Sequence, residues 1–568
     1  MGYGATRTLE RVSAAIGQLE SAPIQFVAAR DVPYGGLLLA VPALLAMGLL
    51  RDSAELYALP QGYYGLSSIL LLLAMMALAR VKCIEQLRYV APGEWGNLLG
   101  LDRIPEVRTL RSKLAILNQE KGRAARWNTE LAKPWMGLAP EAEPMFYVDG
   151  HVRVYHGHGA QLPRHYVARQ KLYLRATADY WINALDGQPF FYINQEIDHG
   201  LVQALRNEVV PWLENNVPGN AENQRRMEAN PRVPRFTVVF DREGYSPDLF
   251  AELDQRQIAV LSYHRYPAED WPVEEFQEQA LVLSNGETVR LQLAERGTRA
   301  PNGLWMREVR KRTGDGHQVA LISTNRSLPA GQLAVSLFAR WAQENYFRYM
   351  RQHYALDRLV EFGSEAISET EVAVNPAWRT LHNDVRKHHA ALRTARAQLA
   401  GRSLTAPISE SEVTRYELRQ GQQRDQVEQL QRELDELKRR RKTTPHHIPV
   451  KDLPEKDRFT RLLPERKHFI DTIKMISYRA ETSMVGILRE RMSRADDARC
   501  LLCQIYDLEA DLIPDPATRY ADRETTPSHA SRPRRSVAAS LRSAQRNRDG
   551  FPRYRNAAPL PGWLILIP

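Results

Sequence analysis

Residues 145–157 read MFYVDGHVRVYHG, and at this stretch the hydrophobic pattern of the chain changes. Up to about residue 135, apolar residues recur at spacings of three and four, which indicates helices. The stretch itself is rich in β-branched and aromatic residues, which indicates a strand. Four similar runs follow, with a helical stretch around 200–215 between the second and the third: 171–177, 189–197, 236–241 and 258–264. The pattern predicts a mixed α/β core that begins near residue 140.

A second group of strand-like segments follows this core, in three ranges: 279–293, 304–312 and 317–324. A helix is then predicted to open near Gln332 and to run past Glu344 to about Arg358. The region from about 370 to 520 has a helical pattern again, and Asn375-Pro376 forms a helix cap followed by a residue suited to the first turn. Four apolar residues in it follow heptad spacing, which predicts a short coiled segment or an amphipathic hairpin: Val427, Leu430, Leu434 and Leu437.

The composition favours a folded protein of several domains. The chain has 568 residues, of which 43% are apolar and 25% charged, and this length suggests about three or four domains. Three cysteines are too few for a disulfide framework, so we expect a protein of the reducing cytoplasm. The 77 basic and 67 acidic residues leave a net charge of +10. This surplus favours a polyanionic partner, either nucleic acid or an anionic membrane surface.

Two apolar stretches near the N-terminus allow two interpretations. Residues 32–50 and 56–79 carry no charge, and with the short connector Arg51 to Glu55 they could form a transmembrane hairpin. Several prolines and glycines break both stretches into shorter pieces, which instead suits buried helices of a soluble domain. The apolar pattern alone leaves both interpretations open.

The region from 521 to 568 differs from the rest of the chain. It contains nine arginines, no lysine and three acidic residues, which accounts for +6 of the total charge. Its prolines and weak apolar periodicity predict disorder from about residue 525. Such a tail either binds nucleic acid or is an unstructured end without a role.

Three acidic residues in the α/β region form a candidate site. Asp149 follows the first apolar run in FYVDG, Asp241 ends a later strand in FTVVFDREGY, and Glu344 lies in the predicted helix. Such carboxylates, gathered at one sheet edge, suit Mg²⁺ or Mn²⁺. Two such ions about 4 Å apart can activate an attacking oxygen and stabilise the leaving oxygen in phosphodiester displacement.

Each of these acids also has a structural explanation. Asp149-Gly150 between apolar residues is typical of a hairpin turn. Asp241 could cap the segment that follows it, and Glu344 lies four residues from both Arg340 and Arg348, a common ion-pair spacing on a helix. Their order along the chain favours a shared site: a strand acid, an acid at the end of a later strand, a strand-rich insertion and a helix acid.

With this order the sequence resembles the DDE transposases of bacterial insertion sequences, over about residues 140–360. In the subgroup that it resembles, Tyr, Arg, Glu and Lys form a signature, and that spacing falls here on Leu337, Arg340, Glu344 and Arg351. The Arg and the Glu match, whereas Leu and Arg replace the Tyr and the Lys. Family members tend to have Asp-Arg-Gly-Tyr after the second strand, and the stretch from Asp241 to Tyr245 is one residue longer.

The resemblance implies a ribonuclease H-like mixed sheet with a β-rich insertion at about 265–325. It implies that Asp149, Asp241 and Glu344 hold two Mg²⁺ (or Mn²⁺) ions and catalyse cutting and joining of DNA. Arg340 and Arg351 are then assigned to DNA phosphates near the scissile bond. The implied partners are double-stranded DNA, as the element's terminal repeats and target DNA, and a second copy of the chain in a homodimer on paired ends. The implied location is the cytoplasm, at the nucleoid.

The N-terminal region then has a role in DNA binding. Residues 94–100 and 105–118 are predicted to form two helices of a helix-turn-helix-like segment, with Pro105 at a first helical position. Three apolar residues of the second helix form its inward face, and three basic residues would contact DNA: Val107, Leu110 and Leu114, and Arg108, Arg111 and Lys113. With this role, the buried-helix interpretation of the apolar stretches is favoured over the membrane interpretation.

The predicted organisation has four parts: a helical DNA-binding region at 1–135, a catalytic domain at 140–360, a helical region at 370–520 and a basic tail at 521–568. The alternative to an active transposase is a non-catalytic protein, either a transposase remnant that binds DNA ends or a membrane-associated DNA-binding protein.

Two other groups of residues carry weaker signals. Cys500 and Cys503 have metal-ligand spacing without a second pair, and both fit a buried helical face. His151, His156 and His158 are expected at the surface or in contact with substrate, rather than on a metal.

Overall fold

The computed structural model describes residues 6–138, 143–167, 169–195, 200–283, 287–360, 363–367, 371–400, 410–455, 458–514 and 563–566. The chain divides into two compact units. The first contains Met1–Tyr155, His165–Phe362 and Leu463–Pro568, and the second contains His156–Arg164 and Gly363–Leu462. The region predicted at 1–135 and most of the region predicted at 140–360 therefore share one unit, with His156–Arg164 in the other, and the region predicted at 370–520 is divided between the two.

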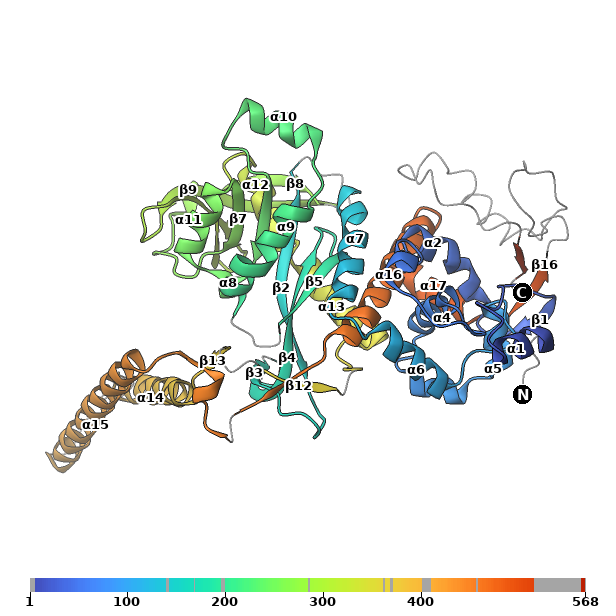
Figure 1. The fold of residues 1–568 in the computed structure, drawn as a ribbon. Coiled ribbons are helices and arrows are strands. Elements are labelled where there is room, and N and C mark those ends of the chain that lie inside the picture. The colour runs from blue at the N-terminus through green and yellow to red at the C-terminus, as the bar shows by residue number, and fades with distance from the viewer. Residues whose placement is uncertain are drawn as a thin grey trace. The chain divides into compact units, whose positions relative to one another are not determined.

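The first unit is built on a mixed sheet of ten strands (Figure 1). Its strand order is β3-β4-β2-β6-β7-β11-β10-β9-β8, and β5 pairs with β4. Strands β2, β6 and β7 are parallel to one another, whereas β4 is antiparallel to both β2 and β5. The bounds of this part are β2 (Met145–Val154), β3 (Arg164–Val167), β4 (Leu172–Asn183), β5 (Pro189–Gln195), β6 (Phe236–Phe240) and β7 (Ile258–Tyr263). The predicted mixed α/β core and its five strands are confirmed.

The second predicted group of strands extends this same sheet. Strand β11 pairs antiparallel with β7, with Leu321 opposite Tyr263, so it covers an edge that would otherwise be unpaired. The remaining strands follow as antiparallel neighbours. The bounds are β8 (Gln277–Val282), β9 (Thr288–Arg299), β10 (Trp305–Arg312) and β11 (Gln318–Ser323). Helix α12 (Ala330–Phe338) contributes Leu333, Ala334 and Leu337 to a core shared with these strands.

Helices connect the parallel strands. Strand β5 leads to β6 through several helices, and β6 leads to β7 through α11. The crossover from β6 to β7 is required because these two strands are parallel neighbours, which need a long connection. The bounds are α8 (Leu201–Ala204), a π-helical turn (Leu205–Val209), α9 (Val210–Asn216), α10 (Ala221–Ala229) and α11 (Pro247–Gln255).

The two apolar N-terminal stretches form buried core segments. Helix α4 (Leu66–Leu78) is apolar on all sides, and every residue from Ser68 to Leu78 is buried. At 13 residues it is about 20 Å long, shorter than the roughly 30 Å core of a bilayer. Among the described residues, no helix is long and apolar enough to cross a membrane. The buried-helix interpretation is confirmed by this burial.

The other N-terminal helices share this core, together with α16 (Glu465–Arg489) from the C-terminal part of the chain. Their bounds are α1 (Thr8–Ala15), α2 (Val41–Ala46), α3 (Ser53–Leu56), α5 (Pro92–Leu98), α6 (Val107–Leu117) and α7 (Arg123–Gly137). Helix α17 (Ala498–Asp507) follows α16 and packs on it.

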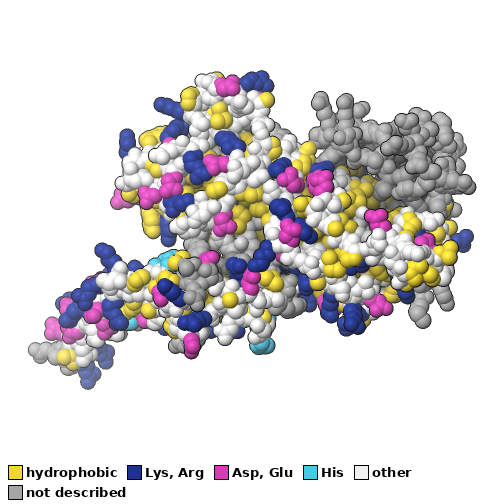
Figure 2. Space-filling view, in the orientation of Figure 1, with side chains coloured by type: hydrophobic (Ala, Val, Ile, Leu, Met, Phe, Trp, Pro, Cys, Tyr) yellow, Lys and Arg dark blue, Asp and Glu magenta, His cyan; other side chains and the backbone are white. Residues whose placement is uncertain are grey.

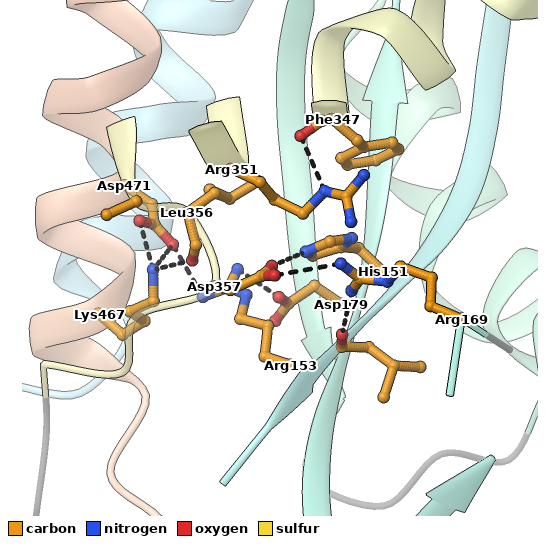
Figure 3. Close-up of polar contacts among 12 residues, drawn as sticks. His151, Arg153, Arg169, Asp179, Phe347, Arg351, Leu356, Asp357, Lys467 and Asp471 are labelled. Atoms are coloured by element: carbon orange, nitrogen blue, oxygen red, sulfur yellow. Dashed lines mark hydrogen bonds and ion pairs between the residues drawn. The ribbon is translucent and has the colours of Figure 1, made fainter. Parts of the chain in front are cut away.

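A buried ionic cluster joins α16 to the sheet (Figure 3). Arg153 of β2 forms ion pairs with Asp179 of β4 and with Asp471 of α16. Lys467 Nζ lies 2.5 Å from Asp471 Oδ1 and also donates to the carbonyl of Leu356. Burial acts to raise the pKa of Asp471, but the nearby cations outweigh it and hold that pKa well below its usual value. The cluster therefore depends on the ionised form of Asp471.

The second unit contains a helical hairpin, visible as two adjacent helices in Figure 1. Helices α14 (Pro376–Ala400) and α15 (Glu410–Thr443) are antiparallel, because Arg396 contacts Gln431 and His382 contacts Arg441. The seam contains Val385 and Leu392 and all four predicted heptad residues: Val427, Leu430, Leu434 and Leu437. On the outside, basic and acidic side chains are intermixed (Figure 2). The predicted amphipathic hairpin is confirmed.

Short strands connect this hairpin to the rest of the second unit. Strand β12 (Ser364–Ala366) pairs with β15 (Thr460–Leu462), and β13 (Val372–Val374) pairs with β14 (His447–Pro449). The Asn375 side chain accepts a hydrogen bond from the N–H of Ala377 at 3.0 Å, as predicted for a helix cap.

The disorder predicted from about residue 525 falls mostly on residues 525–562 and 567–568, which lie outside the described residues. Residues 563–566 are described and form a strand, so the prediction is wrong for them. Strand β17 (Trp563–Leu566) pairs with β16 (Ala510–Pro514), which in turn pairs with β1 (Ala29–Val32).

Candidate active site

Asp149 and Asp241 lie at matching positions of two neighbouring parallel strands. In the register of β2 and β6, Tyr147 is opposite Val239, and each acid lies two residues further along its own strand direction. Because side chains alternate with a period of two, each acid is expected on the same face as the paired residue before it. Tyr147 points to α12, where its hydroxyl donates to the carbonyl of Ser336 at 2.7 Å. The two acids therefore share the face that α12 covers.

The hairpin-turn explanation of Asp149 is wrong. Strand β2 continues through Asp149 and Gly150, which pair with Trp181 and Tyr180 of β4. A ten-residue strand that pairs on both sides overrides the local turn preference of Asp-Gly. Asp149 is therefore placed by the sheet and not by a turn.

The capping explanation of Asp241 is confirmed by its contacts. Its carboxylate accepts a hydrogen bond from the N–H of Glu243 at 2.9 Å, at the start of a 3₁₀ turn (Arg242–Gly244). Its carbonyl accepts a hydrogen bond from the Ser262 hydroxyl of β7 at 3.1 Å. These two contacts fix the acid at the end of β6.

Glu344 lies in the first turn of α13 (Trp341–Tyr354). The single helix predicted from Gln332 to Arg358 is wrong, because the chain bends between α12 and α13. At the bend, hydrogen bonds span three residues: Ala342 N–H donates to the Ala339 carbonyl at 2.8 Å, and Gln343 N–H donates to the Arg340 carbonyl at 3.0 Å. Such a tighter turn redirects the helix axis.

Arg340, at this bend, connects the helix acid to the strand acid. Its Nη2 lies 2.6 Å from Glu344 Oε1, and its Nη1 lies 3.5 Å from Asp149 Oδ2. The predicted ion pair of Glu344 on its own helix is therefore present. The same guanidinium also brings Asp149 and Glu344 into one charge cluster.

The pKa of Asp149 responds to the charges of both other acids. Its side chain is 23% exposed, and its pKa is raised to about 7. Burial is the largest cause, and Asp241 and Glu344 raise the pKa further by repulsion, against the opposing effect of Arg340. The pKa of Tyr263 on β7 is also shifted by this group of charges. Burial raises this pKa, Arg340 lowers it and Glu344 raises it.

The donors of this cluster suit a hard divalent cation, since all three are carboxylates. Within the described ranges, however, no three His, Cys, Asp or Glu side chains lie close enough together to hold a metal ion. Arg340 supplies the positive charge between Asp149 and Glu344. The type of donor therefore suits Mg²⁺ or Mn²⁺, whereas the described side chains do not form a three-ligand site in this arrangement.

Arg351 belongs to a second group of residues further along α13 (Figure 3). Its Nε donates to the Phe347 carbonyl at 3.2 Å. Its pKa is lowered by burial and by Arg169, whereas Asp357 opposes this effect. Asp357 lies 3.3 Å from Arg169 Nη1 and 2.6 Å from His151 Nε2. Arg340 and Arg351, both assigned to DNA phosphates, therefore have separate sets of contacts in this structure.

The environment of His151 differs from the predicted one. It is buried and stacks on Phe347 with a centroid distance of 4.9 Å, so the predicted surface or substrate-contact position is wrong for this residue. His156 and His158 are exposed, as expected. The position of Asp357, far along the chain from His151, has no signal in the sequence.

The N-terminal helices lie close to their predicted ranges. On α6, the inward residues Val107, Leu110 and Leu114 are buried, as predicted, and Glu106 rather than Pro105 precedes the first turn. The basic residues of α6 differ in environment: Arg108 is exposed, Arg111 pairs with Glu85 at 2.5 Å, and burial lowers the pKa of Lys113.

The two C-terminal cysteines do not share a buried face. Cys500 is exposed, and Cys503 is half-buried with its sulfur 3.2 Å from Arg80 Nη2. The buried face of α17 consists of Ala498, Leu502 and Tyr506, so the expectation for Cys500 is wrong.

Comparison with known proteins identifies the family. One solved structure with similarity is the piggyBac transposase synaptic complex with hairpin DNA, at 11% sequence identity and a TM-score of 0.29, covering 62% of this chain and 71% of that one. No curated protein matches the chain. The model of a family described as "Transposase protein" matches residues 2–536. The chain therefore belongs to this family of transposase proteins.

Proposed function

We propose that the chain is a DDE transposase of the insertion-sequence type, which cuts the ends of its element and joins them to target DNA. The observation that carries the proposal is the matched register of Asp149 and Asp241, with Glu344 linked to the same cluster through Arg340. A ribonuclease H-like core is part of the proposal. It is supported by the antiparallel strands β2, β4 and β5 beside the parallel strands β6 and β7.

Asp149, Asp241 and Glu344 would hold two divalent cations, Mg²⁺ or Mn²⁺, which supply activation of an attacking oxygen and stabilisation of a leaving oxygen. Asp149 gains most from a nearby cation, because burial and the two other carboxylates raise its pKa. The cap on Asp241 and the sheet pairing of Asp149 hold these two carboxylates in place before any ligand arrives.

Arg340 is assigned to the phosphodiester near the scissile bond. Its guanidinium now bridges Asp149 and Glu344, and phosphate oxygens bind a guanidinium with the same forked geometry as a carboxylate. Bound DNA therefore competes for Arg340 and releases both carboxylates. Arg351, about three turns along the same helix, is assigned to a more distant phosphate.

Recognition of the terminal repeats is assigned to α6. Arg108 is free to contact DNA at the surface, whereas Arg111 must leave Glu85 to do so. Two copies of the chain acting on paired ends complete the proposal. Replacing Arg108, Arg111 and Lys113 by Ala should weaken end binding and flatten its salt dependence. Each phosphate contact releases counterions from DNA, so fewer counterions are released when contacts are lost.

A second candidate, a transposase remnant that binds ends without cutting, is favoured by one observation. Arg340 forms ion pairs with Asp149 and Glu344, which is a stable arrangement without any metal. Leu337 and Arg351, which replace the Tyr and the Lys of the family signature, also favour this second candidate.

Metal-dependent nicking distinguishes the two candidates. The substrate is DNA that carries the flanking repeats of the chain's own gene, with Mg²⁺ or Mn²⁺. Asp149→Ala, Asp241→Ala and Glu344→Ala should each reduce cleavage and joining by more than about 100-fold, the upper range for residues that only support a metal site. End binding should remain, since recognition is assigned to α6.

Asp270→Ala is the matched control, because the Asp270 side chain is 76% exposed on the same unit. It should cleave at the wild-type rate. Wild-type cleavage by Asp149→Ala would refute the triad, and end binding by the wild type without cleavage in either metal would establish the remnant.

A further inference from the structure

The base of the α14–α15 hairpin carries a concentration of positive charge. Residues Lys438 to Lys442 are five consecutive cations at the C-terminal end of α15. Lys438 lies 3.7 Å from Asp435, and Arg439 lies 3.6 Å from Glu436. No described carboxylate forms an ion pair with Arg440, Arg441 or Lys442. The positive charge therefore exceeds what the hairpin itself neutralises.

Three of these cations line one open hollow of about 570 Å³. We call it the basic hollow and define it by Lys438, Arg441, Lys442, Trp378, Thr444 and His446. Lys438 and Lys442 are one helical turn apart, so they face the same side of α15. The residues that line the hollow include no acid.

Ring contacts hold the two aromatic residues that line the basic hollow, Trp378 and His446, in place. Trp378 stacks on His382 with a centroid distance of 4.9 Å and lies 3.9 Å from the His446 ring. Arg441 Nη1 lies 3.4 Å from His382 Nδ1. Burial lowers the pKa of His382, and the neighbouring Arg441 and Arg386 lower it further. His382 is therefore kept neutral, as an acceptor for Arg441 requires.

Cations at the C-terminal end of a helix interact favourably with the helix dipole, but this effect explains only part of the arrangement of the five cations. One or two basic residues in the last turn suffice for that effect, which is small at an exposed site. Five consecutive cations repel one another, and among them Lys438 and Arg439 alone form ion pairs with described acidic residues of the helix.

We propose that the basic hollow binds the phosphodiester backbone of double-stranded DNA, as a contact surface separate from α6 and from the acidic cluster. Long basic side chains on an exposed, acid-free surface are typical of backbone contacts, which position DNA without reading its sequence. The hollow is open to solvent and lacks the enclosure that a small-molecule site requires. Its use does not depend on catalysis, because it requires neither metal nor cleavage.

The test measures binding of the full chain to a duplex of arbitrary sequence without divalent metal, across salt from about 50 to 200 mM. The variant replaces Lys438, Arg441 and Lys442 by Gln. The slope of log affinity against log salt should fall in magnitude by about 2 to 3, since each phosphate contact contributes about 0.9. Affinity at the lower salt concentration should fall at least about tenfold.

Two further variants make the result specific. Arg419, Arg424 and Arg432 are exposed on the same helix, so replacing them by Gln removes the same charge away from the hollow. This control should keep the wild-type slope, and so should the charge-retaining variant Lys438→Arg, Arg441→Lys, Lys442→Arg. Equal slopes for the hollow variant and the control would overturn the proposal. Unchanged duplex binding with loss of binding to anionic lipid vesicles would overturn the assignment to DNA.

Discussion

Asp149 is the residue on which pH acts most directly. Its pKa is raised from 3.8 to about 7, so between these values the folded chain keeps a proton that the unfolded chain has released. The free energy of unfolding therefore falls as pH rises through this window, by up to about 4 kcal/mol at 1.36 kcal/mol per pKa unit. Asp149→Asn removes this penalty. It should match the wild type near about pH 4 and melt at a higher temperature near about pH 8.

The effect of divalent metal on the wild type and on Asp149→Asn provides a second test of the raised pKa of Asp149. A cation beside Asp149 favours the ionised form, so millimolar Mg²⁺ should raise the melting temperature of the wild type above pH 7 more than that of Asp149→Asn. The exposed Asp270→Asn should follow the wild type throughout. The same pH dependence in the wild type and in Asp149→Asn would contradict the raised pKa.

At the scale of single residues, the order of the acidic residues along the chain predicted only part of the site. Arg340 links Asp149 to Glu344, whereas the meeting of Asp149, Asp241 and Glu344 in one metal site, and their catalytic role, stay predictions. Tyr263 was missed because a strand tyrosine looks like any core residue. Asp357 was missed because its contact with His151 depends on how α13 ends and not on local spacing.

At the scale of elements, the α14–α15 hairpin should open when its seam is weakened. Leu434 is 1% exposed between the two helices, so Leu434→Ala should cost about 2 to 5 kcal/mol. The loss should appear as faster amide hydrogen exchange along α15, while the sheet of the first unit keeps its protection. Leu418→Ala is the control, since Leu418 is 66% exposed on the same helix. Equal exchange in both variants would show that the seam does not hold the hairpin.

The elements also show which patterns were sufficient for prediction. The heptad residues of α15 and the apolar runs of β2, β6 and β7 are long enough that period alone identifies them. The bend at Arg340 had no such signal, because LFARWAQE contains neither proline nor glycine. It arises where α12 follows the sheet core and α13 turns towards Trp181, which contacts Tyr346 and Phe347 of α13.

At the scale of the whole chain, the return of residues 463–514 to the first unit was not predictable from local pattern. The sequence pattern from 370 to 520 predicts helices, although the short strands β14 and β15 lie between α15 and α16. The pattern does not indicate that α15 and α16 belong to different units. The partners of α16 are decided by its side chains. Phe469 contacts Tyr57 and Trp127 from the N-terminal helices, and Asp471 meets Arg153 from the sheet. Long-range contacts of this kind depend on the tertiary fold.

The ionic cluster around Asp471 should therefore control the stability of the first unit. Asp471→Asn leaves Arg153, Lys467 and Lys474 buried with less compensation, which should cost about 3 to 5 kcal/mol. Because the pKa of Asp471 is held low in the folded chain, its stabilising effect is present above about pH 4 and is lost as pH falls further. The difference between variant and wild type, measured from denaturant unfolding of the first unit, should thus shrink in acid. Asp496→Asn, at an exposed position after α16, should be neutral at every pH. If the two variants unfold at the same denaturant concentration at neutral pH, the cluster does not anchor α16 to the sheet.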